Sequence, residues 1–161
     1  MVIGAVALTA HGYRRFTVDI DVVLTTEGLE AFREQLVGRG YRPAFAGARK
    51  KYRTTAGNVP VEIILAGEYP GDGKPKPVSF PAPRTASVEI DGVQVVTLEK
   101  LIELKLASGM TAGDRLKDLA DVQELIKILH LGRDFAERLD EFVRPEYVRL
   151  YDAVERAKET P

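Results

Sequence analysis

Apolar residues in the N-terminal part of the chain alternate between strand spacing and helix spacing. Residues 2–3 predict the end of a short buried strand, and the small apolar residues 5–10 suit a helix packed closely on a sheet. Residues 18–24 predict a second strand. Apolar positions at helical spacing in residues 29–37 then predict a helix, which two nearby glycines would close.

The middle of the chain predicts further strands and one long loop. Residues 50–54 and 59–65 have the character of paired strands around a glycine-containing turn. Residues 88–96 predict a hairpin, because the central Asp-Gly pair favours a two-residue turn. Between them, residues 66–87 are rich in proline and glycine. Loops of this length are uncommon in compact domains unless they bind something.

The rest of the chain shows helical spacing. Thr97 is placed to cap one helix and Asp114 to cap the next. Two further helices are expected over residues 134–143 and 146–158. The fold class predicted from this pattern is α+β, with a short mixed sheet flanked by helices and followed by a C-terminal helical cluster.

Composition is consistent with a compact soluble protein. The 161 residues are 45% hydrophobic and 29% charged, which is ordinary for a globular domain. We expect one main domain over residues 1–130, with residues 131–161 as a helical extension packed on it. The net charge of −1 provides no whole-molecule attraction to nucleic acid or to a membrane surface.

Several functional classes are disfavoured by residue content. The chain has no cysteine, which excludes disulfides and thiol catalysis and fits a reducing, cytoplasmic location. With only two histidines a zinc site is not expected. The apolar start lacks the basic region of a signal peptide. No apolar run approaches the length of about 18 residues that a membrane span needs.

The most informative residues are Asp19 and Asp21. On a strand, residues i and i+2 point to the same side, roughly 6–7 Å apart, which leaves Val18, Ile20 and Val22 for the core. Two like charges this close are unfavourable unless a cation lies between them, and their hard oxygen atoms favour magnesium or manganese. An isolated pair of this kind also fits an exposed sheet face with two solvated aspartates.

Two other positions favour a ligand site at Asp19 and Asp21 over a solvated sheet face. Gly4 lies fifteen residues before Asp19, between apolar residues and a helix-like stretch, where glycine lets a bound group approach the backbone. Glu62 is the one acid in an apolar strand, which is costly unless it is liganded or exposed at an edge. Three carboxylates can hold two cations, which activate an attacking hydroxyl and neutralise a triphosphate.

This combination resembles the nucleotidyltransferase superfamily of the DNA polymerase beta type. The family pattern is a glycine followed by a small residue, two acids spaced i, i+2 on a strand, and a third acid on a later strand. Gly4–Ala5, Asp19 with Asp21, and Glu62 occupy those positions here. The resemblance implies that the three acids are catalytic metal ligands for Mg²⁺ or Mn²⁺, and that Gly4 and Ala5 contact the phosphates of the nucleotide.

The chain is more closely similar to the small bacterial branch related to AbiEii-type abortive-infection toxins. Members have an arginine and a hydroxyl residue just before the acidic pair, matched by Arg15 and Thr17, and a lysine in a later helix, matched by Lys105. Arg115 and the D-x-x-D helix that follows it complete the pattern. The resemblance implies that Arg15, Thr17, Lys105 and Arg115 contact the triphosphate.

The activity implied by the resemblance is transfer of a nucleoside monophosphate from a nucleoside triphosphate to an acceptor hydroxyl. A transfer-RNA end, a protein hydroxyl and a small aminoglycoside-like molecule remain open as acceptors. A protein antitoxin is an implied partner, and no membrane partner is expected. The proline-rich loop would form one wall of the acceptor site. A rival interpretation is a catalytically weak nucleotide-binding or protein-interaction module, favoured by Ala5 where many active members have serine.

Two groups of charged residues have a structural interpretation beside the functional one. Arg115 and Asp118 are spaced to form an i, i+3 ion pair, which we expect to be mainly structural. The basic run 49–53 places alternate cations on one face of a strand. It either protects a sheet edge or contacts phosphates of an acceptor or nucleotide.

Overall fold

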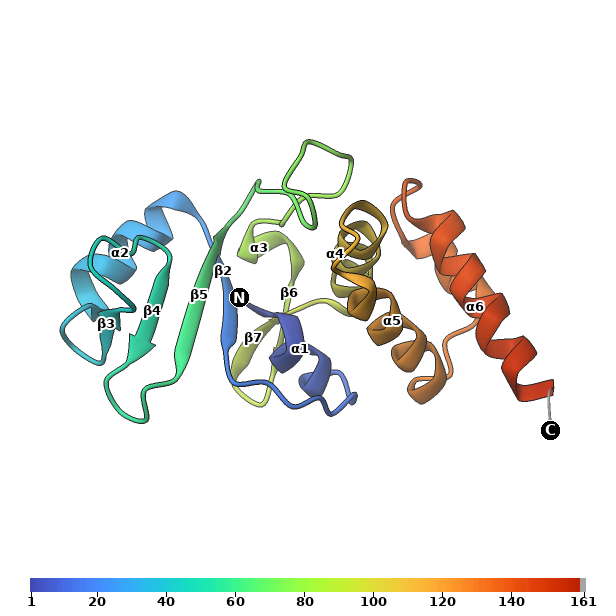
Figure 1. The fold of residues 1–161 in the computed structure, drawn as a ribbon, viewed down its shortest axis with the longest axis horizontal. Helices are drawn as coiled ribbons and strands as arrows, with labels where there is room; N and C mark the ends of the chain where they lie inside the picture. The colour runs from blue at the N-terminus through green and yellow to red at the C-terminus, as the bar shows by residue number, and fades with distance from the viewer. Residues whose placement is uncertain (160–161) are drawn as a thin grey trace. The chain divides into compact units, whose positions relative to one another are not determined.

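The computed structural model describes residues 1–159 (Figure 1). The chain forms two compact units. Unit 1 consists of Met1–Glu68 and Phe80–Thr97, and unit 2 of Tyr69–Ser79 and Leu98–Pro161. All the strands are in unit 1 and the C-terminal helices are in unit 2, so the predicted α+β class is confirmed.

Unit 1 is built on one mixed sheet in the order β3-β4-β5-β2-β1-β7-β6. The central pair β2 and β5 is parallel, as is the pair β1 and β7, whereas the other neighbours are antiparallel. The strands are β1 (Val2–Ile3), β2 (Ile20–Leu24), β3 (Tyr41–Pro43), β4 (Lys51–Thr54), β5 (Pro60–Leu65), β6 (Ser87–Ile90) and β7 (Val93–Val96).

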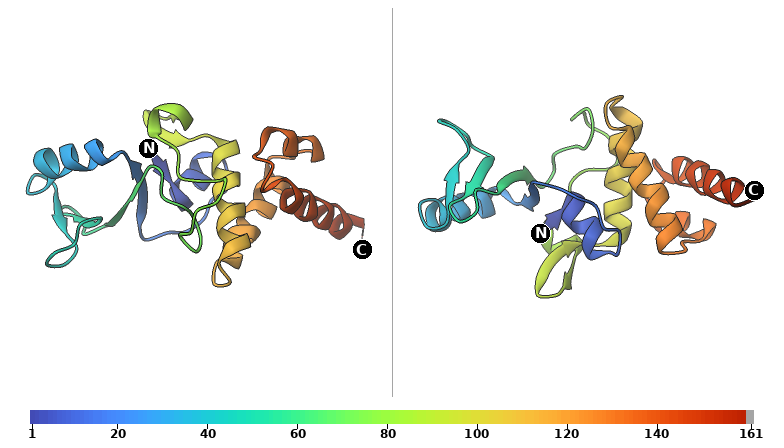
Figure 2. Two further views of the ribbon diagram at one scale, coloured as in Figure 1. Left: turned by 90° about the horizontal axis from the view of Figure 1, so that it is seen from above. Right: turned by 60° about the horizontal axis from the view of Figure 1, so that its bottom comes forward.

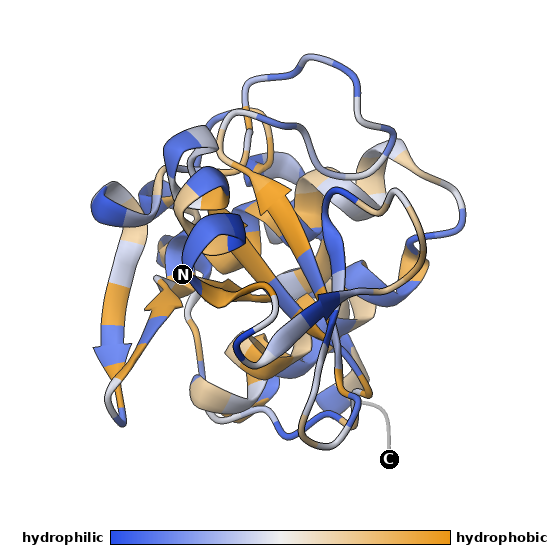
Figure 3. Ribbon diagram, turned by 90° about the vertical axis from the view of Figure 1, so that its left-hand side faces the viewer, coloured by the Kyte–Doolittle hydropathy of each residue, from blue (hydrophilic) through white to orange (hydrophobic). Residues whose placement is uncertain are grey.

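One face of this sheet is covered by α2 (Thr26–Leu36). The hydroxyl of Thr25 caps the helix by accepting a hydrogen bond from the Gly28 amide at 3.0 Å. Leu29 of the helix packs with alternate residues of β5 and with Tyr52 of β4, which are buried. The apolar character of the central strands is visible in Figure 3. Since strand residues alternate between faces, the neighbouring residues of β2 and β5 point to the opposite side.

The other half of unit 1 contains α1 (Gly4–Ala10), the short α3 (Pro83–Ala86) and the β6–β7 hairpin. Helix α1 packs on β1, β2 and β7 through buried Ala7 and Leu8, as expected for its small residues. The predicted hairpin is confirmed. Asp91 and Gly92 both have positive φ, at 50° and 77°, which is the backbone that a two-residue turn of this kind requires.

Unit 2 is helical apart from residues 69–79. Its elements are α4 (Leu98–Thr111), α5 (Leu116–Ile128), η1 (Arg133–Arg138) and α6 (Arg144–Glu159). Helix α5 packs against both α4 and α6, and the views of Figure 2 show the three side by side. Within the described residues no helix is long and apolar enough to span a membrane.

Two expectations about this part of the chain differ from the structure. Asp114 does not cap α5, whose N-terminal flanking residue is Arg115 and has no side-chain cap. Residues 134–143 form only a short 3-10 helix, Arg133–Arg138, instead of a longer α-helix.

The proline-rich segment of unit 2 is held by contacts of its own. Gly71 has φ of 72°, and a Cβ there would lie 2.3 Å from the Thr111 hydroxyl and 2.9 Å from the Ser108 carbonyl oxygen. The Lys76 ammonium donates to the Pro70 carbonyl at 2.8 Å and to Asp72 at 2.7 Å. Gly71 is therefore required for packing on α4, and the Lys76 charge is neutralised locally. The acceptor-wall role of this segment stays a prediction.

Candidate functional site

Two of the predicted site residues are direct neighbours across the sheet. Asp21 of β2 pairs in register with Glu62 of the parallel strand β5, and Ile3 of β1 pairs with Asp21 on its other side. Both acids alternate with the residues that pack on α2, so both lie on the sheet face away from that helix. Neighbouring strands are about 4.8 Å apart, which places the two carboxylates within reach of a shared ligand.

Gly4 approaches Asp21 closely. It is the first residue of α1 and has φ of 65°. A Cβ at this position would lie 2.3 Å from the Asp21 Oδ2 atom, much closer than any side chain tolerates. Glycine is therefore needed for two reasons, the left-handed backbone and the adjacent carboxylate. Ala5 follows in the first turn and is half-buried.

Asp19 lies just before β2, because the strand begins at Ile20. Its carboxylate and its carbonyl oxygen both accept hydrogen bonds from the Thr17 hydroxyl. The expectation that Val18 faces the core is wrong. Val18 is 66% exposed and Phe16 is 89% exposed, since the segment before Ile20 is not paired in the sheet. Arg15 lies half-buried in the same segment.

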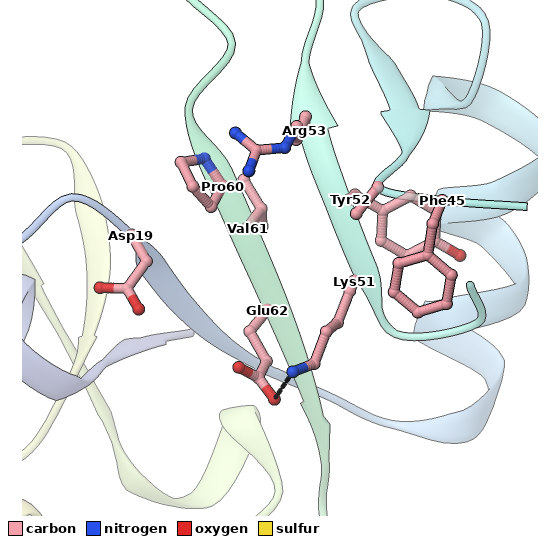
Figure 4. A pocket seen from close by; sticks show the side chains of 9 residues that line it. Asp19, Phe45, Lys51, Tyr52, Arg53, Pro60, Val61 and Glu62 are labelled. Atoms are coloured by element: carbon pink, nitrogen blue, oxygen red, sulfur yellow. Dashed lines mark ion pairs between the residues drawn. The ribbon is translucent and has the colours of Figure 1, made fainter.

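Asp19 and Glu62 nevertheless line one depression of about 350 Å³. Figure 4 shows Asp19 on the segment that enters β2, with Glu62 on β5 and Lys51 on β4. The Lys51 ammonium lies 3.8 Å from the Glu62 Oε1 atom. Arg53 and the exposed ring of Phe45 belong to the same lining. With Tyr52, the depression thus combines two acids, two cations and two aromatic rings.

The donor set suits a hard cation, although its side chains are not gathered around one point. Carboxylate oxygens are the ligands that magnesium and manganese prefer. In residues 1–159 no group of three or more histidine, aspartate or glutamate side chains is placed to hold a metal ion. The Asp19 carboxylate accepts a hydrogen bond from the Thr17 hydroxyl, and Glu62 forms an ion pair with Lys51. Binding a cation at all three acids would require these side chains to exchange partners.

The remaining predicted site residues, Lys105 and Arg115, are in unit 2, in a charge cluster where buried Lys105 contacts two buried acids and exposed Arg115 contacts one of them. Lys105, only 7% exposed, donates through its ammonium to Asp118 at 3.0 Å and to Asp121 at 2.7 Å. Ser108 donates to the second Asp118 oxygen at 2.8 Å. Arg115 donates to the same oxygen at 2.8 Å, so the predicted i, i+3 ion pair is confirmed. The roles of Lys105 and Arg115 as triphosphate contacts stay predictions.

The electrostatics of this cluster are those of a satisfied buried network. Burial alone would raise the pKa of Asp118. The nearby charge of Lys105, the hydrogen bonds from Lys105 and Ser108, and the charge of Arg115 outweigh that effect and hold the pKa below its ordinary value. Asp118 is therefore stabilised in its ionised form by the fold itself.

Sequence reasoning did not single out Lys51 or Phe45 as members of the site. Lys51 was one cation of a basic run with two interpretations. Its pairing with Glu62 follows from the β4–β5 register, in which Lys51 lies opposite Glu62. The glycine-containing turn between those strands was the signal from which this register was predictable. No sequence signal indicated that Phe45, 61% exposed, would lie beside it.

Comparisons with known proteins support the fold and leave the function open. No protein-family model matches the chain, and no curated protein matches it. The chain is similar to a solved structure described as the crystal structure of JHP933 from Helicobacter pylori. The likeness has a TM-score of 0.50 at 17% sequence identity, and it covers 99% of this chain and 84% of that one. At this identity the likeness supports the architecture alone.

Proposed function

We propose that the protein is a metal-dependent nucleotidyltransferase that moves a nucleoside monophosphate from a nucleoside triphosphate to an acceptor hydroxyl. The observation that carries the proposal is the in-register pair Asp21 and Glu62, with Gly4 packed against the Asp21 carboxylate. Two acids side by side on one sheet face, with a glycine backbone close to one of them, suit a cation that carries a phosphate chain.

The position of each residue suggests its role in the proposed reaction. Asp21 and Asp19 would hold the cations, Mg²⁺ or Mn²⁺, and Glu62 would complete one of the two sites and accept the proton of the acceptor hydroxyl. When bound, the cations neutralise the triphosphate and increase the acidity of the hydroxyl. Thr17 orients Asp19 through its hydroxyl.

The phosphate side of the site is assigned to the start of α1. Gly4 and Ala5 would present their backbone to the triphosphate, with Arg15 as a nearby cation. Lys105 is not needed in this scheme, because its ammonium already neutralises Asp118 and Asp121. A structural role for Lys105 is the simpler assignment, since a buried lysine between two buried acids stabilises all three charges.

The decisive experiment measures incorporation of label from each of the four α-labelled nucleoside triphosphates into cell extract or into the protein itself, with and without magnesium. We expect chelator-sensitive incorporation by the wild type. Asp21→Asn should reduce it by at least two orders of magnitude, because a lost metal ligand removes several kcal/mol of transition-state stabilisation. Unchanged incorporation by Asp21→Asn would contradict the assignment of the site.

The rival function is a nucleotide-binding or protein-interaction module with little catalysis. Ala5 favours it, because an alanine has no hydroxyl for a phosphate, and so does the ungathered arrangement of the three acids. Calorimetry with a nucleoside triphosphate separates the two functions. Magnesium-dependent binding without any incorporation supports the module, whereas binding with incorporation supports the enzyme.

A cytoplasmic location and a toxin–antitoxin role are part of the proposal, because nucleoside triphosphates are cytoplasmic and the resembling branch contains toxins. Induced expression should arrest growth if the protein is such a toxin. Asp21→Asn should relieve the arrest at equal protein level. Arrest by the Asp21→Asn variant would show that the effect does not come from transfer.

A further inference from the structure

The Lys51–Glu62 pair lies inside the candidate site, and Lys51 has no part in the proposed chemistry. The two residues are register partners on β4 and β5, and their charged atoms are 3.8 Å apart. Both line the depression that also contains Asp19 (Figure 4). Glu62 is one of the three proposed metal ligands, so the Lys51 ammonium competes with a metal ion for its carboxylate.

The Lys51–Glu62 ion pair is weak enough for a metal ion to displace Lys51. The Lys51 and Glu62 side chains are 60% and 46% exposed, and ion pairs between exposed groups contribute little. A divalent cation bound to Glu62 would repel the Lys51 ammonium at this distance. Lys51 would then move away from Glu62, and it would need an anion as its new partner.

The depression indicates where that anion comes from. Arg53 lies on the same strand as Lys51, two residues further on, and also lines the depression. Two cations that line the same depression favour an anionic ligand, and phosphate oxygens are the anions that a nucleotidyl transfer brings to the site. Lys51 is therefore positioned to pass from a carboxylate of the protein to a phosphate of the substrate.

We propose that Lys51 is a positioning residue that makes Glu62 available to metal only when a phosphate group has drawn Lys51 away. This inference rests on the proposed function and deepens it. It makes metal binding and phosphate binding cooperative, because each removes one partner of the Lys51–Glu62 pair. A protein of this kind binds divalent cations weakly until a phosphate chain is present.

The test measures Mn²⁺ affinity by electron paramagnetic resonance at physiological ionic strength, with and without inorganic tripolyphosphate. In the wild type, tripolyphosphate should increase Mn²⁺ affinity. Lys51→Met should increase the affinity for Mn²⁺ alone by about two- to fivefold, which is the range that an exposed pair accounts for. The enhancement by tripolyphosphate should decrease correspondingly.

Lys50→Met is the matched control. Lys50 is the neighbouring residue and is ion-paired with Glu68, which is not one of the proposed metal ligands. Because the Lys50 charge is paired with Glu68 and not with Glu62, removing Lys50 should leave Mn²⁺ affinity unchanged. An equal increase in Lys50→Met and Lys51→Met would overturn the inference, since it would show a general charge effect.

A double-mutant comparison decides whether Lys51 acts through Glu62. Glu62→Gln should weaken Mn²⁺ binding, and adding Lys51→Met to it should produce no further increase in affinity. An increase of the same size in the Glu62→Gln background overturns the inference while leaving the metal site intact. A wild type that binds no Mn²⁺ under either condition overturns the proposed function as well, so the two failures are distinguishable.

Discussion

The two units contain the same kinds of charged residue in opposite environments. In unit 2, Lys105 lies between Asp118 and Asp121, all buried and joined by hydrogen bonds of 3.0 Å or less. In unit 1, Lys51 lies 3.8 Å from Glu62, both about half exposed, and no buried partner completes the set. The difference indicates that the buried cluster of unit 2 stabilises the fold, whereas the exposed pair of unit 1 can exchange its partners for a ligand.

The physical reason for this distinction is solvation. A buried ion pair has lost its water, so each charge depends on the other and neither can leave without a large penalty. An exposed pair keeps most of its hydration, so its partners can separate at little cost. Catalytic and binding groups must exchange partners during function. The half-exposed acids of unit 1 meet that requirement, and the buried cluster of unit 2 does not.

The largest effect expected from this comparison is on stability. Lys105→Met should lower the free energy of unfolding by about 3–5 kcal/mol, because it removes the buried cation that Asp118 and Asp121 share. Lys51→Met should change it by less than about 1 kcal/mol. Urea denaturation of both variants measures the difference. Equal small losses would show that the unit 2 cluster is more hydrated than its burial indicates.

The second-largest effect is expected for Gly4→Ala. It forces an alanine to adopt φ of 65° and places a Cβ against the Asp21 carboxylate, so we expect a stability loss of about 1–3 kcal/mol and a loss of transfer activity. Gly38→Ala is the control, because Gly38 has φ of 82° and nothing within 4 Å of its Cβ position. If both variants lose stability and activity equally, the contact with Asp21 is unimportant.

The third prediction concerns pH. The folded-state pKa of Asp118 lies below its ordinary value of 3.8, so the ionised residue stabilises the fold above that pH. This stability should be lost as pH falls through the folded-state pKa. Unfolding measurements between pH 2 and 7 should therefore show an acid limb that Asp118→Asn makes shallower. A variant with the wild-type acid limb would assign acid sensitivity to other carboxylates.

The smallest expected effect is that of Asp19→Asn. Asp19 is exposed, and an asparagine oxygen can still accept the hydrogen bond from Thr17. In chelator we expect a thermal melt within about 0.5 kcal/mol of the wild type, or mild stabilisation because a clustered negative charge is removed. A large loss of stability would mean that Asp19, like Asp118, has a structural role.

The strands and helices were largely predictable because their signals are local. Alternation identified β2 and β5, the Asp91–Gly92 pair identified a hairpin, and helical spacing identified α4 and α5. The same logic failed at Val18, where alternation continued past the end of the paired strand. It also failed at Asp114, since a capping residue type does not decide where a helix begins.

What the sequence determined by itself was the fold class and the identity of the candidate acids, because Asp19, Asp21 and Glu62 stand out against apolar strands. Only the tertiary structure decided their surroundings. The parallel pairing of β2 with β5 joined Asp21 to Glu62, and the position of α1 brought Gly4 against Asp21. These are contacts between distant segments, and local periodicity carries no information about which strands become neighbours.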